Sequence, residues 1–341
     1  MVGTDIAIDL GTSLLKIYAQ GKGIVVKVPS AVAFDTIKEE VIAVGREAYQ
    51  MVGRTSERVE IIRPLNNGVI SNFSMAQHLI MHFIKQVSGS RMFMPRVVVS
   101  VPCVITEVQK RAVVDAISAT GVRKICLIEE PVAAAMGAGV DISAPHGTFV
   151  VDIGGGTTDM AVISLNGIAI SDSIAIAGDA FNDAIIKYIR RKYGVAIGER
   201  TAEDAKVAIG CAYPKRVLET YTVKGIHTVK GLPQSLEITS DELMEALIEP
   251  AMQIVRKVQA TLDATPPELL ADILTDGMVL TGGSSNLWGL ATLLSKKTRI
   301  PVRLNEHPED CVALGAGKAL SFIDVMDNRG GGTLNPLFAQ Y

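Results

Sequence analysis

Two stretches of similar pattern, AIDLGTSLLKIYA at residues 7–19 and VVDIGGGTTDMAVIS at residues 150–164, constrain the fold most strongly. In each stretch, aliphatic residues lead to an aspartate, Asp9 or Asp152. Glycine and small hydroxyl residues follow, and then apolar residues alternate again. This pattern is typical of two strands joined by a tight turn. Because it occurs near the start of each half of the chain, it predicts a duplicated unit with a ligand held between the copies.

Composition places the chain among soluble globular proteins and narrows its partners. With 341 residues, 48% hydrophobic and 20% charged, the chain can form two domains with cores of their own. A net charge of −3 without a run of Lys or Arg argues against nucleic acid and against a purely electrostatic membrane attachment. We identify no signal peptide and no uncharged apolar run of about 18 residues or more, the length that a membrane span requires.

The cysteines are scattered and form no Cys-x-x-Cys pair. Buried thiols in a reducing compartment are therefore favoured over a metal or redox site. The four positions are Cys103, Cys126, Cys211 and Cys311.

The periodicity predicts strands and helices in the same order twice, and so an α/β fold of two related domains facing each other. In the first half we expect strands at 5–9, 14–19, 23–26, 96–101 and 124–128, with helices at 74–87, 106–119 and 130–138. In the second half we expect strands at 147–152, 159–164 and 167–173, with a helix at 179–192. Two less regular insertions, 33–73 and 180–245, are interpreted as subdomains.

The second insertion and the segment after it contain further predicted elements. We expect a short helix at 201–210, a strand pair within 220–239 and a helix at 240–261, capped by Ser240 with Glu242 just inside. A third glycine turn follows a strand in MVLTGGSSNLWGL, residues 278–290, and leads into a helix.

The glycine turns indicate a phosphate site. Glycines let backbone N–H groups approach an anion, and small hydroxyls beside them complete such a nest. Asp9 and Asp152 would repel phosphate unless a hard cation, Mg²⁺ with its water shell, lies between acid and phosphate. A polar surface hairpin is the alternative for either copy alone. The chain lacks G-x-x-x-x-G-K-[ST], and GGG lies between two strands, which excludes the P-loop and the dinucleotide fingerprint.

Several motifs resemble the superfamily of actin, sugar kinases and seventy-kilodalton chaperones. They are DLGTS (9–13), IEEPVAAAMGAG (128–139), VVDIGGGTTD (150–159), GERTAEDAK (198–206), VLTGGSSNLWGL (279–290) and VALGAGKAL (312–320). GKGIVV, IRPLNNGVISNF, PRVVVSVPCVITEVQKRAV, YGVAIGERTAE and ATPPELLADI are similar to the MreB family of bacterial actins, over about residues 5–325.

The resemblance implies an actin-like fold with a nucleotide cleft between its two domains, each carrying an inserted subdomain. The implied boundaries are 1–32, 74–144 and 315–328 for subdomain IA, 33–73 for IB, 145–179 and 246–314 for IIA, and 180–245 for IIB. Residues 329–341 are expected to form a flexible tail.

The same resemblance assigns ATP or ADP with Mg²⁺ to the cleft. It implies that Asp9 and Asp152 hold Mg²⁺ through water and that Lys206 lines the adenine. The implied phosphate, ribose and adenosine contacts are Gly11, Thr12, Ser13, Gly154, Gly155, Gly156, Thr157, Gly178, Asp179, Glu203, Lys206, Gly282, Gly283 and Ser284.

Glu130 and Thr157 are the implied catalytic residues of a weak ATPase, with Glu130 orienting the attacking water. From the residues alone, Glu130 can equally favour the helix start before which it lies. Departures from the family pattern around the nucleotide leave its affinity, base preference and hydrolysis rate open: Ser13, Leu14, Leu15, Ala177 and Ala208.

By resemblance, the function is a membrane-associated filament that organises cell-wall synthesis and rod shape. The implied partners are the protein itself, a lipid surface and membrane proteins of cell-wall elongation, at the inner face of the cell membrane in the cytoplasm. A sugar-type kinase would need a second pocket with an acid as base for the acceptor, and a chaperone would continue into a peptide-binding domain. A division-type actin relative would show a C-terminal amphipathic helix, which NRGGGTLNPLFAQY does not resemble.

One apolar triplet, in SGSRMFMPR at residues 88–96, is a candidate membrane contact. Met92, Phe93 and Met94 lie between Arg91 and Arg96, bounded by Gly89 and Pro95. An apolar triplet in a loop is ordinarily part of the core. Here the arginines and turn residues favour an exposed tip that enters a lipid interface, and the family resemblance places a membrane-contacting loop at this position.

Overall fold

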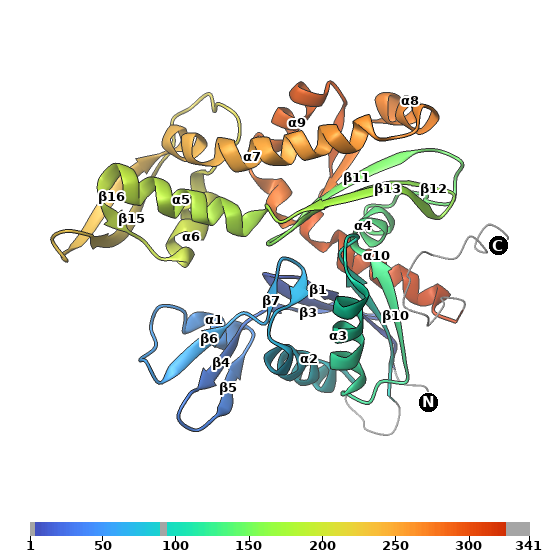
Figure 1. Ribbon diagram of the computed structural model, residues 1–341, viewed down its shortest axis with the longest axis horizontal. Coiled ribbons are helices and arrows are strands. Elements are labelled where there is room, and N and C mark those ends of the chain that lie inside the picture. Colours follow the sequence, from blue (N-terminus) through green and yellow to red (C-terminus); the bar gives the residue numbers. More distant parts are fainter. Residues whose placement is uncertain (1–3, 89–93, 325–341) are drawn as a thin grey trace.

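Both predicted hairpins are present, and each begins a five-stranded sheet of the same topology (Figure 1). The computed structural model describes residues 4–88 and 94–324. The first sheet has the order β10-β9-β1-β2-β3, and the second the order β13-β12-β11-β17-β18. In each, three antiparallel strands are followed by two strands that pair in parallel with the first. The duplication predicted from the two motifs is therefore confirmed.

The strands match the predicted positions closely. The first sheet contains β1 (Ile6–Leu10), β2 (Leu14–Ala19), β3 (Gly23–Pro29), β9 (Arg96–Val101) and β10 (Lys124–Glu129). The second contains β11 (Thr148–Ile153), β12 (Thr158–Ser164), β13 (Gly167–Ile174), β17 (Met278–Thr281) and β18 (Val302–Leu304).

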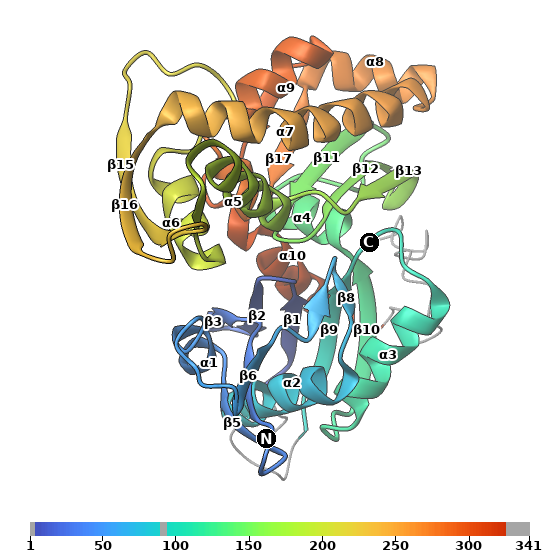
Figure 2. The same cartoon turned by 60° about the vertical axis from the view of Figure 1, so that its left-hand side comes forward.

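Two helices lie between the sheets and join the halves of the molecule (Figure 2). They are α4 (Glu130–Gly137) and α10 (Cys311–Ala319), and they pack against each other. Their small side chains share one hydrophobic cluster with residues of both sheets. The outer faces are covered by α2 (Phe73–Ser88) and α3 (Glu107–Ser118) on the first sheet, and by α7 (Ser240–Asp263), α8 (Pro267–Asp276) and α9 (Leu290–Thr298) on the second.

Each half carries a small inserted unit, and the two units face each other across the open side of the molecule (Figure 1). The first contains the sheet of β4 (Val32–Asp35), β5 (Glu40–Val44) and β6 (Val59–Ile62), helix α1 (Arg46–Gln50), and the hairpin β7 (Leu65–Asn66) and β8 (Val69–Ile70). The second contains β14 (Val195–Ala196), β15 (Thr220–His227), β16 (Pro233–Thr239) and α6 (Glu199–Ile209), next to α5 (Gly178–Tyr193).

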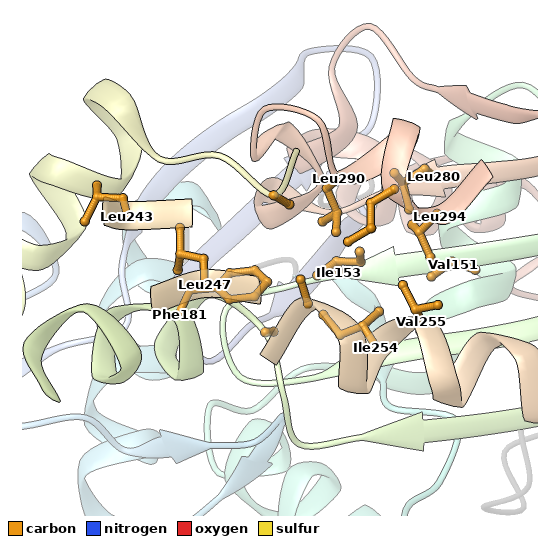
Figure 3. Close-up of a cluster of buried hydrophobic side chains, with 14 of the residues drawn as sticks. Val151, Ile153, Phe181, Leu243, Leu247, Ile254, Val255, Leu280, Leu290 and Leu294 are labelled. Atoms are coloured by element: carbon orange, nitrogen blue, oxygen red, sulfur yellow. The ribbon is translucent and has the colours of Figure 1, made fainter. Parts of the chain in front are cut away.

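A large apolar core holds the second half together (Figure 3). Alternate residues of β11, Val151 and Ile153, point from the sheet toward α7, where Ile254 and Val255 meet them. Phe181 of α5 is fully buried in the same cluster. Burial contributes about 1.5–3 kcal/mol for each such side chain, so the second hairpin and its turn rest on a rigid base.

The structure corrects three details of the prediction. Thr239, and not Ser240, caps α7: its hydroxyl accepts from the Glu242 N–H at 3.3 Å, and the Glu242 carboxylate accepts from the Thr239 N–H at 2.8 Å. Sequence reasoning chose the serine one position too late. The third glycine turn continues into a 3₁₀ turn, η1 (Gly283–Asn286), and α9 begins at Leu290. Helices α8 and α10 were not predicted.

The predicted membrane loop is only partly described. Met92 and Phe93 lie outside the described residues, as does the predicted tail, and Met94 is half-buried. No helix among residues 4–88 and 94–324 has the length and apolar character needed to cross a bilayer. The cysteines are free thiols; Cys126, Cys211 and Cys311 are buried and Cys103 is partly buried.

Candidate functional site

Three turns that are far apart in the sequence meet at the floor of a cleft of about 650 Å³ between the two halves. They are the β1–β2 turn, the β11–β12 turn and the turn after β17. The Ser284 hydroxyl donates to the Gly154 carbonyl at 2.6 Å, and the Asp179 N–H donates to the Gly155 carbonyl at 2.8 Å. These bonds fix the third turn and the start of α5 against the second hairpin.

The two hairpin turns approach so closely that side chains are excluded between them. A Cβ on Gly155 would lie 2.0 Å from the Ser13 hydroxyl oxygen, and one on Gly156 would lie 2.6 Å from the Thr12 hydroxyl oxygen. The glycine run is therefore required by packing, and it leaves backbone and small hydroxyls as the lining of the cleft floor.

The β7–β8 hairpin closes one side of this floor and was missed from the sequence. Its Gly68 N–H donates to the Thr12 hydroxyl at 2.8 Å. Asn67 and Gly68 both have positive φ, at 49° and 74°. The pair Asn-Gly is a strong hairpin signal, so the turn itself could have been predicted, although its place beside Thr12 could not.

Buried acids concentrate at the same floor. Asp9, Asp152 and Glu130 are each less than 10% exposed and line the cleft. Burial raises the pKa of Asp152 to about 7, although the Thr281 hydroxyl donates to this carboxylate at 2.6 Å and opposes the shift. Burial also raises the pKa of Glu130 well above its usual value, and the nearby charges of Asp159, Asp9 and Asp152 add to the shift. A cation bound here would relieve this strain between carboxylates.

The acids fit Mg²⁺ in one way. Carboxylate oxygens are hard donors that suit this ion. Within the described part of the chain, no group of three or more His, Cys, Asp or Glu is arranged to hold a metal by itself. Asp9 and Asp152 therefore suit an ion that takes its other ligands from water and from a bound phosphate.

Lys16 adds a positive charge that the sequence reasoning overlooked. Its ammonium lies 2.9 Å from the Asp9 carboxylate and also donates to the backbone carbonyl of Glu309. Lys16 is buried and lines the cleft. A single charged residue in the otherwise apolar strand LLKIYA could have marked it, since a buried lysine needs a partner.

Charged and aromatic side chains form the upper walls of the cleft. Lys206 donates to Glu203 at 2.7 Å and to the Gly178 carbonyl at 3.1 Å. The one tryptophan of the chain, Trp288, lines the cleft, and the Lys215 ammonium lies 5.6 Å from its ring centroid. Neither Trp288 nor Lys215 was singled out from the sequence.

One cationic side chain spans the open side of the cleft. Arg63, directly after β6, contacts Asp179 of α5 at 3.5 Å and Glu199 of α6 at 2.5 Å. It therefore joins the two inserted units above the floor. Arg63 was also missed from the sequence.

The structure brings every residue predicted for the nucleotide and metal to this cleft. Of the positions that depart from the family pattern, Leu14 and Ala208 line it as well, whereas Leu15 and Ala177 are buried in the cores beneath. The residues placed together are Asp9, Gly11, Thr12, Ser13, Glu130, Asp152, Gly154, Gly155, Gly156, Thr157, Gly178, Asp179, Glu203, Lys206, Gly282, Gly283 and Ser284.

Comparison with known proteins agrees with this architecture. Residues 3–328 match the model of the family described as MreB/Mbl protein. The chain belongs to the MreB/Mbl family. The cell shape-determining protein MreB of Escherichia coli (strain K12) is 48% identical over 332 residues, covering 95% of each chain. The family resemblance inferred from the motifs is thereby confirmed.

Solved structures confirm the actin-like fold of this MreB/Mbl chain. The crystal structure of MreB5 of Spiroplasma citri bound to ADP superposes with a TM-score of 0.91 at 34% identity, covering 94% of this chain and 97% of that one. The MamK double helical filament shares the fold, with a TM-score of 0.77 at 20% identity over 93% of this chain and 99% of that one.

Proposed function

We propose that this chain is an ATP-binding bacterial actin that hydrolyses ATP slowly and assembles into membrane-associated filaments that organise cell-wall synthesis and rod shape. The convergence of the three turns and the buried acids in one cleft is the observation that carries the proposal. A relative at 34% identity was crystallised with ADP, which supports a nucleotide in the equivalent cleft.

The chain's own residues suit the binding of a triphosphate. The two hairpin turns present backbone groups and the hydroxyls of Thr12, Ser13 and Thr157 toward the cleft floor. Asp9 and Asp152 would hold Mg²⁺ through water, and the ion, when bound, would offset phosphate charge. Beside Trp288, the side walls carry the apolar surface that a base requires.

Glu130 is proposed to orient the attacking water, with the Thr157 hydroxyl helping to hold that water or the γ-phosphate. Both side chains are buried at the cleft floor. Phosphoryl transfer to water needs little covalent chemistry from the protein, so one oriented water and charge compensation are sufficient. A water-excluding site also strengthens each of these contacts.

We predict different defects for two acids of the cleft. Glu130→Ala should bind ATP but release phosphate at least about tenfold more slowly, because it loses water orientation. Asp152→Ala should weaken binding of ATP with Mg²⁺ itself. Equilibrium dialysis with labelled ATP and a phosphate-release assay separate the two defects, and Glu129→Gln is the adjacent control. Phosphate release that is unchanged in Glu130→Ala at matched ATP occupancy would remove Glu130 from the mechanism.

Exposed apolar side chains at the tips of both inserted units support self-association there. Ile37, in the β4–β5 turn, is 73% exposed, and Val229, in the β15–β16 turn, is 88% exposed. An interface between different surfaces of successive copies propagates without closing, which produces filaments. The fold of the MamK double helical filament is the same, so this architecture is compatible with such assembly.

Sedimentation with ATP and Mg²⁺, with and without liposomes, tests the assembly part. We expect material to pellet above a critical concentration, and to recruit liposomes through Met92, Phe93 and Met94 once many copies are linked. A protein that stays monomeric under every nucleotide and lipid condition, yet phosphorylates a sugar, would be a kinase of the same superfamily. A serine triplet at 92–94 that still binds lipid would place the membrane contact elsewhere.

A further inference from the structure

Lys16 is built into the floor of the cleft opposite Asp9. In the antiparallel pair β1–β2, Asp9 and Lys16 are direct cross-strand partners, so their side chains leave the sheet on the same face. The ammonium lies 2.9 Å from Asp9 Oδ2 and donates as well to the Glu309 carbonyl of η2 (Pro308–Asp310). The Lys16 side chain is 7% exposed and lines the cleft with Asp152 and Glu130.

The surroundings hold this lysine in its charged form. Burial alone would lower its pKa, but Asp9 raises it through charge and a hydrogen bond, and Asp310 and Asp152 add to that effect. The result is a fixed positive charge among buried acids. Within the described structure, two of the three N–H donors of the ammonium contact protein acceptors, which leaves one for a ligand.

We propose that Lys16 is the built-in cation of the phosphate site, contacting a nucleotide phosphate and reducing the dependence of nucleotide binding on Mg²⁺. The inference rests on the proposed function. Two bare carboxylates would repel a polyphosphate unless a metal ion lay between them. Here Lys16 already neutralises Asp9, and its ammonium faces the same floor as the glycine turns. Lysine is a common point-charge partner of phosphate in other nucleotide sites.

The test compares ATP affinity in excess Mg²⁺ and in EDTA, by equilibrium dialysis and by the fluorescence of Trp288. The variant is Lys16→Met, which keeps the length of the side chain and removes the charge. Lys27→Met is the matched control, because Lys27 is the cross-strand neighbour of Lys16 on β3 and pairs with Asp310 at 2.8 Å. Its side chain is 39% exposed and lies outside the cleft lining.

Wild type and Lys27→Met should lose less than about tenfold in ATP affinity when Mg²⁺ is replaced by EDTA. In Lys16→Met this loss should be at least about tenfold larger than in wild type. Either a loss of tenfold or more in wild type, or a Lys16→Met ratio that increases by less than tenfold, overturns the inference. Wild type that binds no ATP in either buffer would instead refute the proposed function.

Removal of Lys16 alone leaves Asp9 buried without its partner, so Lys16→Met can unfold. Two further variants keep the inference testable in that case. Asp9→Asn retains the ammonium and frees it toward phosphate, so it should bind ATP in EDTA more tightly than wild type. The double variant Asp9→Asn/Lys16→Met removes both charges and should lose that gain. Equal ATP affinity of these two variants in EDTA would contradict a phosphate contact by Lys16.

Discussion

Glu129 and Glu130 are neighbours in the sequence, yet the structure gives them different surroundings. Glu130 faces the acids of the cleft. Glu129 is the N-cap residue of α4, and its Oε2 is buried and lacks a hydrogen-bond partner within the described residues. Burial raises the pKa of Glu129 to about 7, with Lys110 among the groups that oppose the shift. Only Glu130 is therefore placed to act on a bound phosphate, whereas Glu129 affects the stability of the fold.

Glu129 should make stability depend on pH. Its folded-state pKa of about 7 exceeds the usual 4.5, so the folded state binds more protons than the unfolded state between these values. The unfolding free energy should therefore fall as pH rises through this window, by at most about 1.4 kcal/mol for each pKa unit. Glu129→Gln should gain stability relative to wild type as pH rises from about 4.5 to 7. Urea unfolding across this range measures it, with exposed Glu107→Gln as control; a difference independent of pH would contradict the prediction.

At the scale of elements, local pattern predicted most of the fold. The hairpins around Asp9 and Asp152, the order of strands and the two insertions follow from periodicity and glycine turns within short windows. The third glycine turn, at Gly282, was found for the same reason. Helix α10 was missed because CVALGAGKA is small and apolar throughout and shows no polar face. The contact of Lys16 with Glu309 was not predictable, since it joins residues 293 positions apart.

The crossing of α4 and α10 is the contact between elements on which the cleft depends. A Cβ on Gly315 of α10 would lie 1.7 Å from the Ala133 carbonyl oxygen, and one on Gly137 of α4 would lie 1.8 Å from the Cys311 carbonyl oxygen. Backbone therefore meets backbone at this crossing. The helices cannot separate without moving the two sheets apart, because their side chains pack against both.

Gly315→Ala should destabilise the protein by about 3 kcal/mol or more, at the upper end of the usual overpacking cost, because a backbone carbonyl and not a side-chain tip must move. The helix propensity of alanine offsets at most about 1 kcal/mol of this loss. Guanidinium unfolding measures it. Gly167→Ala, whose added Cβ would lie 3.7 Å from the nearest atom, is the control. If both variants have the same midpoint, the helices have room to adjust.

At the scale of the whole molecule, the two halves are joined at two places of different strength. On one side α4 and α10 pack between the sheets, so this side resembles a hinge buried in the core. On the open side Arg63 reaches from one inserted unit to Asp179 and Glu199 of the other half. The Arg63 side chain is 31% exposed, which makes these ion pairs weaker than the packed side and sensitive to salt.

We therefore predict that Arg63 controls how fast nucleotide leaves the cleft. Arg63→Met should increase the dissociation rate of a fluorescent ATP analogue about fivefold, the effect of losing about 1 kcal/mol of closure. The charge-swapped pair Arg63→Glu/Glu199→Arg should recover part of this loss, and added salt should reduce the difference between wild type and Arg63→Met. Arg58→Met, which removes an ion pair with Asp35 inside the same inserted unit, is the matched control in a stopped-flow chase. Equal dissociation rates for Arg63→Met and Arg58→Met would show that the cleft opens without breaking the Arg63 contacts.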